Sequence, residues 1–137
     1  MGGNKDLRER TKQFALRVLR LYRALPARGE ARVIGKQLLR SGTSVGANYR
    51  AACRARSRAE FVAKLGIVLE EADESLFWLE LLQESGIIRS TLLTPLLQEA
   101  NELTSIFTAS ICTGKGIASQ VGRLLFQLLH SNFCILT

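Results

Sequence analysis

Residues 57–82 read SRAEFVAKLGIVLEEADESLFWLELL, and this stretch decides the fold class. It opens with the capping box Ser57-Arg58-Ala59-Glu60, in which the serine oxygen accepts a hydrogen bond from a terminal amide and the glutamate reaches back to the serine amide. Apolar residues then recur at three- and four-residue steps on one helix face, namely Phe61, Leu65, Val68, Ala72, Leu76, Leu79 and Leu82. Gly86 is a suitable stop after the last turn. A long amphipathic helix is therefore predicted here.

The end of this helix carries more apolar surface than one core needs. Between Leu76 and Leu82 the only polar residue is Glu80, so the helix is apolar nearly all round. The exposed helix of a monomer does not have this pattern, because a large apolar patch in water marks a contact surface. We predict a subunit interface at Phe77, Trp78 and Leu81.

The preceding segment, from about Glu30 to about Ala55, keeps helical apolar spacing through an unfavourable middle, SGTSVGAN (residues 41–48). A glycine inside a helix costs about 1 kcal/mol relative to alanine. One continuous helix is still predicted, because the apolar phase is unbroken. Gly42 and Gly46 are four residues apart and so form a small-residue face for close helix packing. A P-loop is excluded, since no Gly-Lys-Ser/Thr follows.

Asn48 is the polar residue of interest in this segment, and two interpretations of it stay open. A buried amide could set the register of neighbouring helices, as it does in coiled coils. A local hydrogen bond to the backbone is the alternative.

Two outer segments complete the pattern. The first helix is expected from about Lys5 to Leu25, and the fourth from Ser90 or Thr94 to Gly114, the later start having Pro95 as its first helical residue. Long helices joined by short connections must run antiparallel, so residues 1–114 are predicted to form an all-α, antiparallel up-and-down four-helix bundle. Residues 115–137 are a divergent apolar C-terminal tail, in which an additional amphipathic helix is predicted.

Charge divides the 137-residue chain, whose net charge is +7. Residues 1–64 hold 16 lysines and arginines against 4 acids, whereas residues 65–137 hold 3 against 8. This asymmetry favours a polyanion partner or self-assembly, with a merely solvated surface as the plain alternative. The predicted nucleic-acid-binding residues are Arg28, Arg32, Lys36, Arg40, Arg50, Arg54, Arg56 and Arg58. Tyr49 is the only aromatic residue among them, so the expected binding is to the backbone and sensitive to salt.

No catalytic, metal-binding or cofactor-binding residue set is found. The only histidine is His130, in the tail, so neither a nucleophilic triad nor the Glu-x-x-His pairs of a metal-binding bundle can be built. Glu70 and Glu74 are expected to lie in water or to meet arginines of a neighbouring copy. An odd number of cysteines with no close pair in the sequence, no signal peptide and no apolar run of membrane-spanning length favour a cytoplasmic protein.

Three stretches carry a resemblance to a known family: residues 38–49 (LLRSGTSVGANY), residues 57–61 (SRAEF) and residues 69–79 (LEEADESLFWL). They resemble the small four-helix-bundle proteins encoded in intervening sequences of bacterial 23S ribosomal RNA genes, a family related to the accessory protein of diversity-generating retroelements. The resemblance implies a ring-like homopentamer without catalytic activity. For the retroelement relatives it implies a basic surface that contacts nucleic acid and a reverse transcriptase. It ends near Thr113.

Two functions follow from the residues and the resemblance together. The first is a non-catalytic, homo-oligomeric bundle that acts as a nucleic-acid-binding accessory or scaffold, with RNA or DNA backbone and a reverse transcriptase as candidate partners. The second is a protein–protein interaction module in which basic and acidic halves of adjacent copies pair and nucleic acid has no role. Membrane association is not expected, because the polar face of the tail holds only one cation, Arg123.

Overall fold

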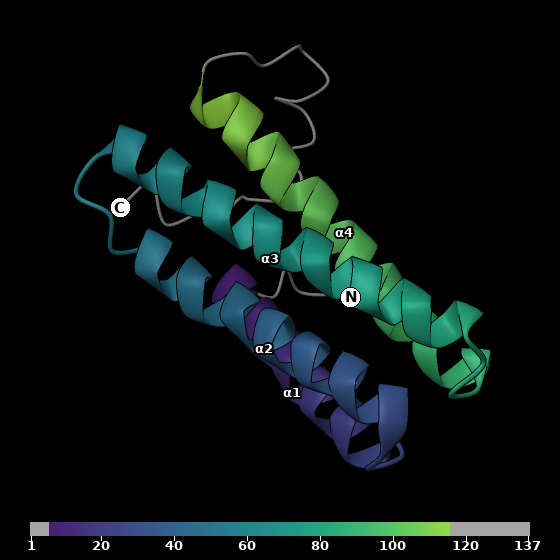
Figure 1. Ribbon diagram of the computed structural model, residues 1–137. Helices are drawn as coiled ribbons and strands as arrows, with labels where there is room; N and C mark the ends of the chain where they lie inside the picture. Colours follow the sequence, from purple (N-terminus) through teal and green to yellow (C-terminus); the bar gives the residue numbers. More distant parts are fainter. Residues whose placement is uncertain (1–5, 116–137) are drawn as a thin grey trace.

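The computed structural model describes residues 6–115 of the chain. Its helices are α1 (Leu7–Ala24), α2 (Gly29–Ala52), α3 (Arg58–Glu84) and α4 (Ser90–Gly114). Successive helices run antiparallel and pack side by side, with α1 and α2 forming one half of the molecule and α3 and α4 the other (Figure 1). The predicted all-α up-and-down bundle is confirmed. The helix predicted in the tail lies outside the described residues.

Local signals set the helix ends. Ser57 Oγ accepts a hydrogen bond from the Glu60 amide at 3.1 Å, as the capping box predicts. The return contact differs from the prediction, because Glu60 Oε2 accepts from the Arg56 amide at 2.9 Å rather than from Ser57. Ser57 is fully extended (φ −146°, ψ 161°), which leaves the preceding amide in reach of the carboxylate. The fourth helix starts at Ser90, so Pro95 lies within its second turn instead of at its first position.

The glycine-containing middle of α2 is helical throughout, as predicted, because α1 packs directly on it. A Cβ added to Gly42 would lie 2.9 Å from Val18 Cγ2, and one added to Gly46 would lie 3.3 Å from the Thr11 carbonyl oxygen. Any larger residue would therefore hold the two helices apart. The close α1–α2 contact offsets the poor intrinsic helix propensity of this segment.

The core along α3 corrects one expectation. Ser75 is fully buried, whereas Leu76, which was predicted on the core stripe, is only half-buried. Ser75 Oγ donates to the Glu71 carbonyl oxygen at 2.8 Å and lies 3.0 Å from the buried Ser41 Oγ on α2. Two small hydroxyl side chains let α2 and α3 approach closely, and their hydrogen bonds satisfy the buried oxygens. A leucine at position 75 would not fit this contact.

Candidate nucleic-acid interface

The division of charge along the chain becomes a division in space. Because α1 pairs with α2 and α3 with α4, the basic N-terminal half of the sequence forms one side of the bundle and the acidic half the other (Figure 1). Side chains of opposite charge then meet where the two sides join, along the α1–α4 seam and the α2–α3 seam. These seams decide which cations are neutralised within the chain.

Arg10 spans the α1–α4 seam. Its Nε donates to Glu99 Oε1 at 2.6 Å, its Nη2 donates to Glu99 Oε2 at 3.1 Å, and the same Nη2 also pairs with Glu102. The hydrogen bond to Glu99 raises the pKa of Arg10 above its ordinary value, against the opposing effect of burial. Arg10 is therefore an anchor between helices and belongs to the bundle, not to a ligand surface.

Arg40 spans the α2–α3 seam, which corrects two expectations. Its guanidinium pairs with Glu74 and lies 3.4 Å from Glu71 Oε2, so it is partly neutralised by its own chain. Glu74 consequently meets an arginine of the same copy instead of water or a neighbour. It also accepts a hydrogen bond from Trp78 Nε1 at 3.1 Å. The Arg40 hydrogen bond, followed by that of Trp78, lowers the pKa of Glu74.

The remaining cations on α2, and one in the turn after it, lie on one exposed side of the molecule. Arg32 and Lys36 stand four residues apart on α2, and Arg50 returns to the same helical face after an interval that contains Thr43 and Ala47. Arg54 follows in the turn after the helix, which ends at Ala52. All four cations are exposed, and none has an ion pair within residues 6–115. We call these four residues the α2 basic row. It replaces the predicted stripe that included Arg40.

The three other predicted cations lie at the ends of α2 or beyond. Arg28 is the N-cap residue of α2, and Arg56 precedes the capping serine of α3. Arg58 Nη2 donates to the Thr113 carbonyl oxygen at 2.9 Å and so ties the start of α3 to the end of α4. Arg58 thus has a structural contact, whereas Arg28 and Arg56 extend the charged surface at the two ends of the basic row.

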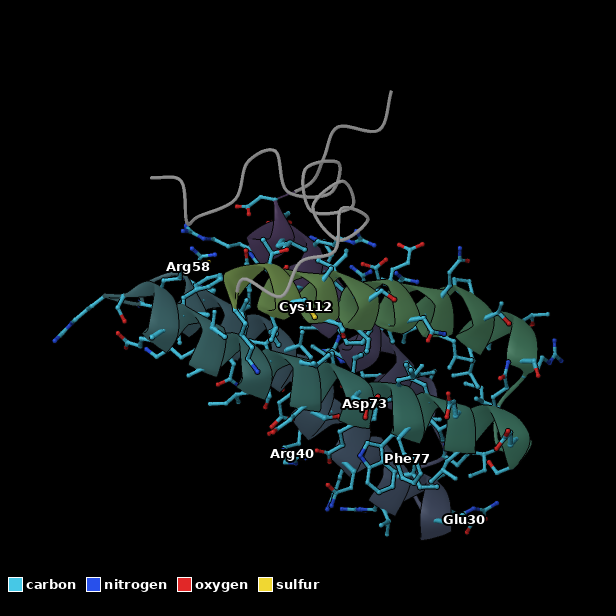
Figure 2. All side chains as sticks on the ribbon, turned by 90° about the horizontal axis from the view of Figure 1, so that it is seen from above. Glu30, Arg40, Arg58, Asp73, Phe77 and Cys112 are labelled. Carbon is cyan, nitrogen blue, oxygen red and sulfur yellow. The ribbon has the colours of Figure 1, made fainter. Side chains whose placement is uncertain are left out.

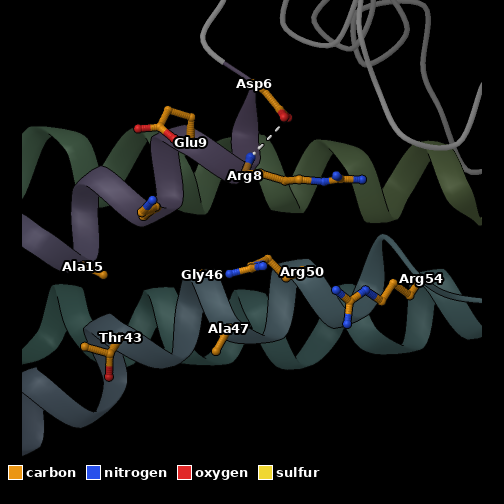
Figure 3. A pocket seen from close by; sticks show the side chains of 10 residues that line it. Asp6, Arg8, Glu9, Ala15, Thr43, Gly46, Ala47, Arg50 and Arg54 are labelled. Atoms are coloured by element: carbon orange, nitrogen blue, oxygen red, sulfur yellow. Dashed lines mark hydrogen bonds between the residues drawn. The ribbon is translucent and has the colours of Figure 1, made fainter.

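A groove between α1 and α2 gathers additional cations that the sequence reasoning missed. It has a volume of about 480 Å³, and Figure 3 shows the side chains that line it. Arg8 and Lys12 enter from α1, Arg50 enters from α2, and Arg54 enters from the turn that follows α2. In this view Arg8 on α1 and Arg50 on α2 lie on opposite sides of the groove, while Asp6 and Glu9 lie above α1 on the side away from α2. Four cations thus share one hollow, with two carboxylates at its outer rim.

The groove exists because the helices touch beneath it. Gly46 forms part of its floor, where α2 meets the backbone of α1 at Thr11. The antiparallel α1–α2 hairpin brings the start of α1 next to the end of α2, so Arg8 and Lys12 come to lie beside Arg50. That antiparallel pairing, combined with the four-residue spacing of Arg8 and Lys12, was the signal in the sequence that could have found them.

Comparisons with known proteins agree with this architecture. Residues 4–109 match the family model described as 23S rRNA-intervening sequence protein. The chain belongs to this family. No curated protein sequence matches it. A crystal structure from the S23 ribosomal protein family, of a Bacteroides thetaiotaomicron protein with unknown function, is 38% identical and superposes with a TM-score of 0.72. The match covers 77% of this chain and 98% of the Bacteroides protein.

The residues expected to form the subunit interface of this 23S rRNA-intervening sequence protein lie on and beside the outer side of α3. Phe77 is 50% exposed, whereas Trp78 and Leu81 are half-buried. The Phe77 and Trp78 rings meet edge to face with centroids 5.0 Å apart. The aromatic pair is therefore partly supported by its own helix and by Glu74, which leaves the phenylalanine ring as the protruding element.

Asn48 makes a local contact. Its Nδ2 donates to the Ser44 carbonyl oxygen at 2.8 Å, one turn earlier on α2, and the side chain is half-buried. Of the two interpretations of Asn48, this geometry matches the hydrogen bond to the backbone.

Two further properties of this family member bear on its chemistry. Within residues 6–115, His, Cys, Asp and Glu side chains form no group that could hold a metal ion. Across the same residues, no helix combines the length and the apolar character needed to cross a bilayer. The concentration of positive charge on the α1–α2 side is therefore the surface feature from which a function is argued.

Proposed function

We propose that the protein is a non-catalytic, homo-oligomeric accessory or scaffold that binds the phosphate backbone of RNA or DNA through its α1–α2 side. The observation that carries this proposal is the position of the cations that remain after Arg10 and Arg40 have paired. Along α2 the basic row runs from Arg32 to Arg50, which corresponds to about 27 Å at 1.5 Å per residue, and Arg54 follows just beyond the end of the helix. Phosphates of one strand follow one another at about 3.4 Å along a duplex and wind around it, so a straight row of this length meets the phosphates where the backbone crosses the row.

Contacts of this kind position a nucleic acid without reading its sequence. The three arginines of the row can form bidentate hydrogen bonds with phosphate, and together with Lys36 they release counterions when they bind. Tyr49, the aromatic residue nearest to the row, is only 1% exposed and packs its ring against Phe107 with centroids 5.7 Å apart. It cannot stack on a base, so the expected affinity depends on backbone charge and hardly at all on sequence.

The salt dependence of binding tests the proposal. If about six phosphates are neutralised, log K should fall against log salt with a slope of about −5 for a duplex and about −4 for a single strand. Replacing Arg50 and Arg54 with glutamate should make the slope shallower by about 2. Arg89→Glu is the matched control, because Arg89 is also exposed but belongs to the acidic half. A slope near zero for the wild-type chain would remove nucleic-acid binding from the proposal.

Assembly is the second element of the proposal. The exposed Phe77 ring, on a helix that is apolar nearly all round at this level, supports a homo-oligomer. The resemblance to the family favours a pentamer. Sedimentation equilibrium should then give a particle of about five times the 15.2 kDa chain mass. A reverse transcriptase as a further partner stays a prediction, which co-purification of the two proteins would test.

The segregation of charge also supports a protein–protein interaction module in which the basic side of one copy pairs with the acidic side of the next. Arg32→Glu combined with Lys36→Glu separates the two functions, and Arg40 is left unchanged because it pairs within its own chain. Lost assembly would favour the interaction module. Intact assembly with weakened RNA binding would favour the nucleic-acid accessory.

A further inference from the structure

The α1–α4 seam opens into a hollow at one end of the bundle. Near the start of α1 the seam is held by Arg10, Glu99 and Glu102. Over their whole length, α1 and α4 contact each other far less closely than the other neighbouring helices do. A hollow of about 250 Å³ lies between the end of α1 and the start of α4, and its lining residues include Arg17, Arg20, Leu21, Ile88, Leu92 and Leu96.

This hollow is apolar inside and positive at its edge. Leu92 is 60% exposed, although it is one of several aliphatic side chains that gather at this point. Arg17 and Arg20 stand on the α1 side, and neither forms an ion pair with any residue between 6 and 115. The apolar recess with its exposed leucine suits an apolar side chain, and the two arginines beside it suit negative charges next to that side chain.

A surface with the opposite character occurs elsewhere on the same molecule. Phe77 is exposed on α3, and Asp73 lies one turn before it (Figure 2). Glu80 follows Phe77 by three residues and so lies one turn after it. Both carboxylates are exposed, and neither has an ion pair inside the described part of the chain. The surface is thus an aromatic ring between two negative charges, which matches the hollow in polarity and in charge.

We infer that Phe77 of one copy inserts into the α1–α4 hollow of the next copy, with Asp73 and Glu80 near Arg17 and Arg20 of that copy. This inference rests on the homo-oligomer of the proposed function and identifies the two surfaces that meet. The surfaces differ and lie on different faces, so the contact is head-to-tail. Such a contact continues around a ring or along a filament and does not stop at a two-fold dimer.

The heights of the two surfaces along the bundle favour a ring. Phe77 lies seven residues before the end of α3, and Leu96 lies six residues after the start of α4. At 1.5 Å per residue both are about 10 Å from the same end of the bundle. Copies joined at equal height are related by a rotation without a shift along the bundle axis. Repeating such a rotation leads to a closed ring, whereas a shift along the axis would give a filament.

Two complementary variants test the inference by mass. Phe77→Arg removes the exposed aromatic side chain and leaves the hollow intact. Leu92→Glu introduces a negative charge into the hollow and leaves Phe77 intact. Each full-length variant alone should sediment as a monomer of 15.2 kDa. An equimolar mixture should form a heterodimer of twice that mass and grow no further. The Leu92→Glu copy still has its Phe77 side chain and the Phe77→Arg copy still has its hollow, so only one contact can form. Ile67→Arg, on the same helix and 46% exposed, is the matched control and should assemble like the wild type.

Each other outcome overturns the inference in a recognisable way. Variants that still assemble alone, or a mixture that stays monomeric, would place the contact elsewhere while leaving the oligomer and RNA binding intact. A monomeric wild type would remove the oligomer as well, and residues 116–137 of the same chain would become the segment to look for in the hollow. Circular dichroism checks that the variants fold, and Phe77→Ser with Leu92→Ser repeats the test without added charge.

Discussion

Replacing Gly42 with alanine should destabilise the protein, although alanine is the better helix former. The new Cβ would lie 2.9 Å from Val18 Cγ2 and 3.0 Å from Val18 Cγ1. Val18 is fully buried, and a β-branched side chain has little freedom to rotate away. Overpacking of this kind costs about 1–3 kcal/mol, against a gain of about 1 kcal/mol in helix propensity. The expected net loss is therefore about 1 kcal/mol in the free energy of unfolding.

Gly66 provides the matched control, since it also lies within a long helix. A Cβ built on Gly66 meets nothing within 4 Å. Gly66→Ala should therefore show the propensity gain alone, a stabilisation of about 1 kcal/mol. The difference between the two substitutions, about 2 kcal/mol, measures the cost of separating α1 from α2 at Val18.

Urea unfolding followed by circular dichroism, at one fixed protein concentration, measures these values. Val18→Ala should relieve the contact, so Gly42→Ala in that background should become neutral or stabilising, with a coupling energy of about 1–3 kcal/mol. Equal stabilisation by Gly42→Ala and Gly66→Ala in the wild-type background would refute the close α1–α2 contact. The groove that depends on this contact would then lose its structural basis.

Two further predictions concern the seams. Arg10→Ala should lower the free energy of unfolding by about 1–2 kcal/mol, because it leaves the half-buried Glu99 without its partner. Arg40→Ala, at the more exposed seam, should lower it by less. Equal losses for the two variants in urea unfolding would contradict this ranking. The Arg40 hydrogen bond lowers the pKa of Glu74, so its contribution to stability is present above the ordinary glutamate pKa and is lost as the pH falls through the lowered pKa. Glu74→Gln should remove this part of the acid-induced loss, and an unchanged profile of Tm against pH would show that the pair does not contribute.

Much of the fold could be predicted because its signals are local. The capping serine, the apolar spacing and the positions of Gly29 and Gly86 depend on residues within one or two turns of each other. Both glycines have positive φ values, 58° and 72°, at the chain reversals. Local patterns left two starts open for the fourth helix, Ser90 and Thr94, and α4 begins at the earlier one, Ser90. Pro95 is tolerated within α4 because its missing N–H affects only one hydrogen bond near the helix end.

The candidate site was predicted only in part, because charge partners come from other helices. The sequence placed Arg40 in line with Arg32 and Lys36, and their four-residue spacing is real. It could not show that α3 presents Glu71 and Glu74 opposite Arg40. Which cations remain available to a ligand depends on the rotation and the neighbours of each helix, and neither is encoded in one helix alone.

By itself, the sequence determined four antiparallel helices, their approximate ends and a chain whose basic and acidic residues are separated. Periodicity and capping chemistry suffice for this, since both act through hydrogen bonds and side chains a few residues apart. Tertiary packing alone decided that Ser75 is buried in place of Leu76, and that Arg8 and Lys12 meet Arg50 and Arg54 in one groove. These outcomes depend on how closely two helices approach, and that distance is set by the small residues of both partners together.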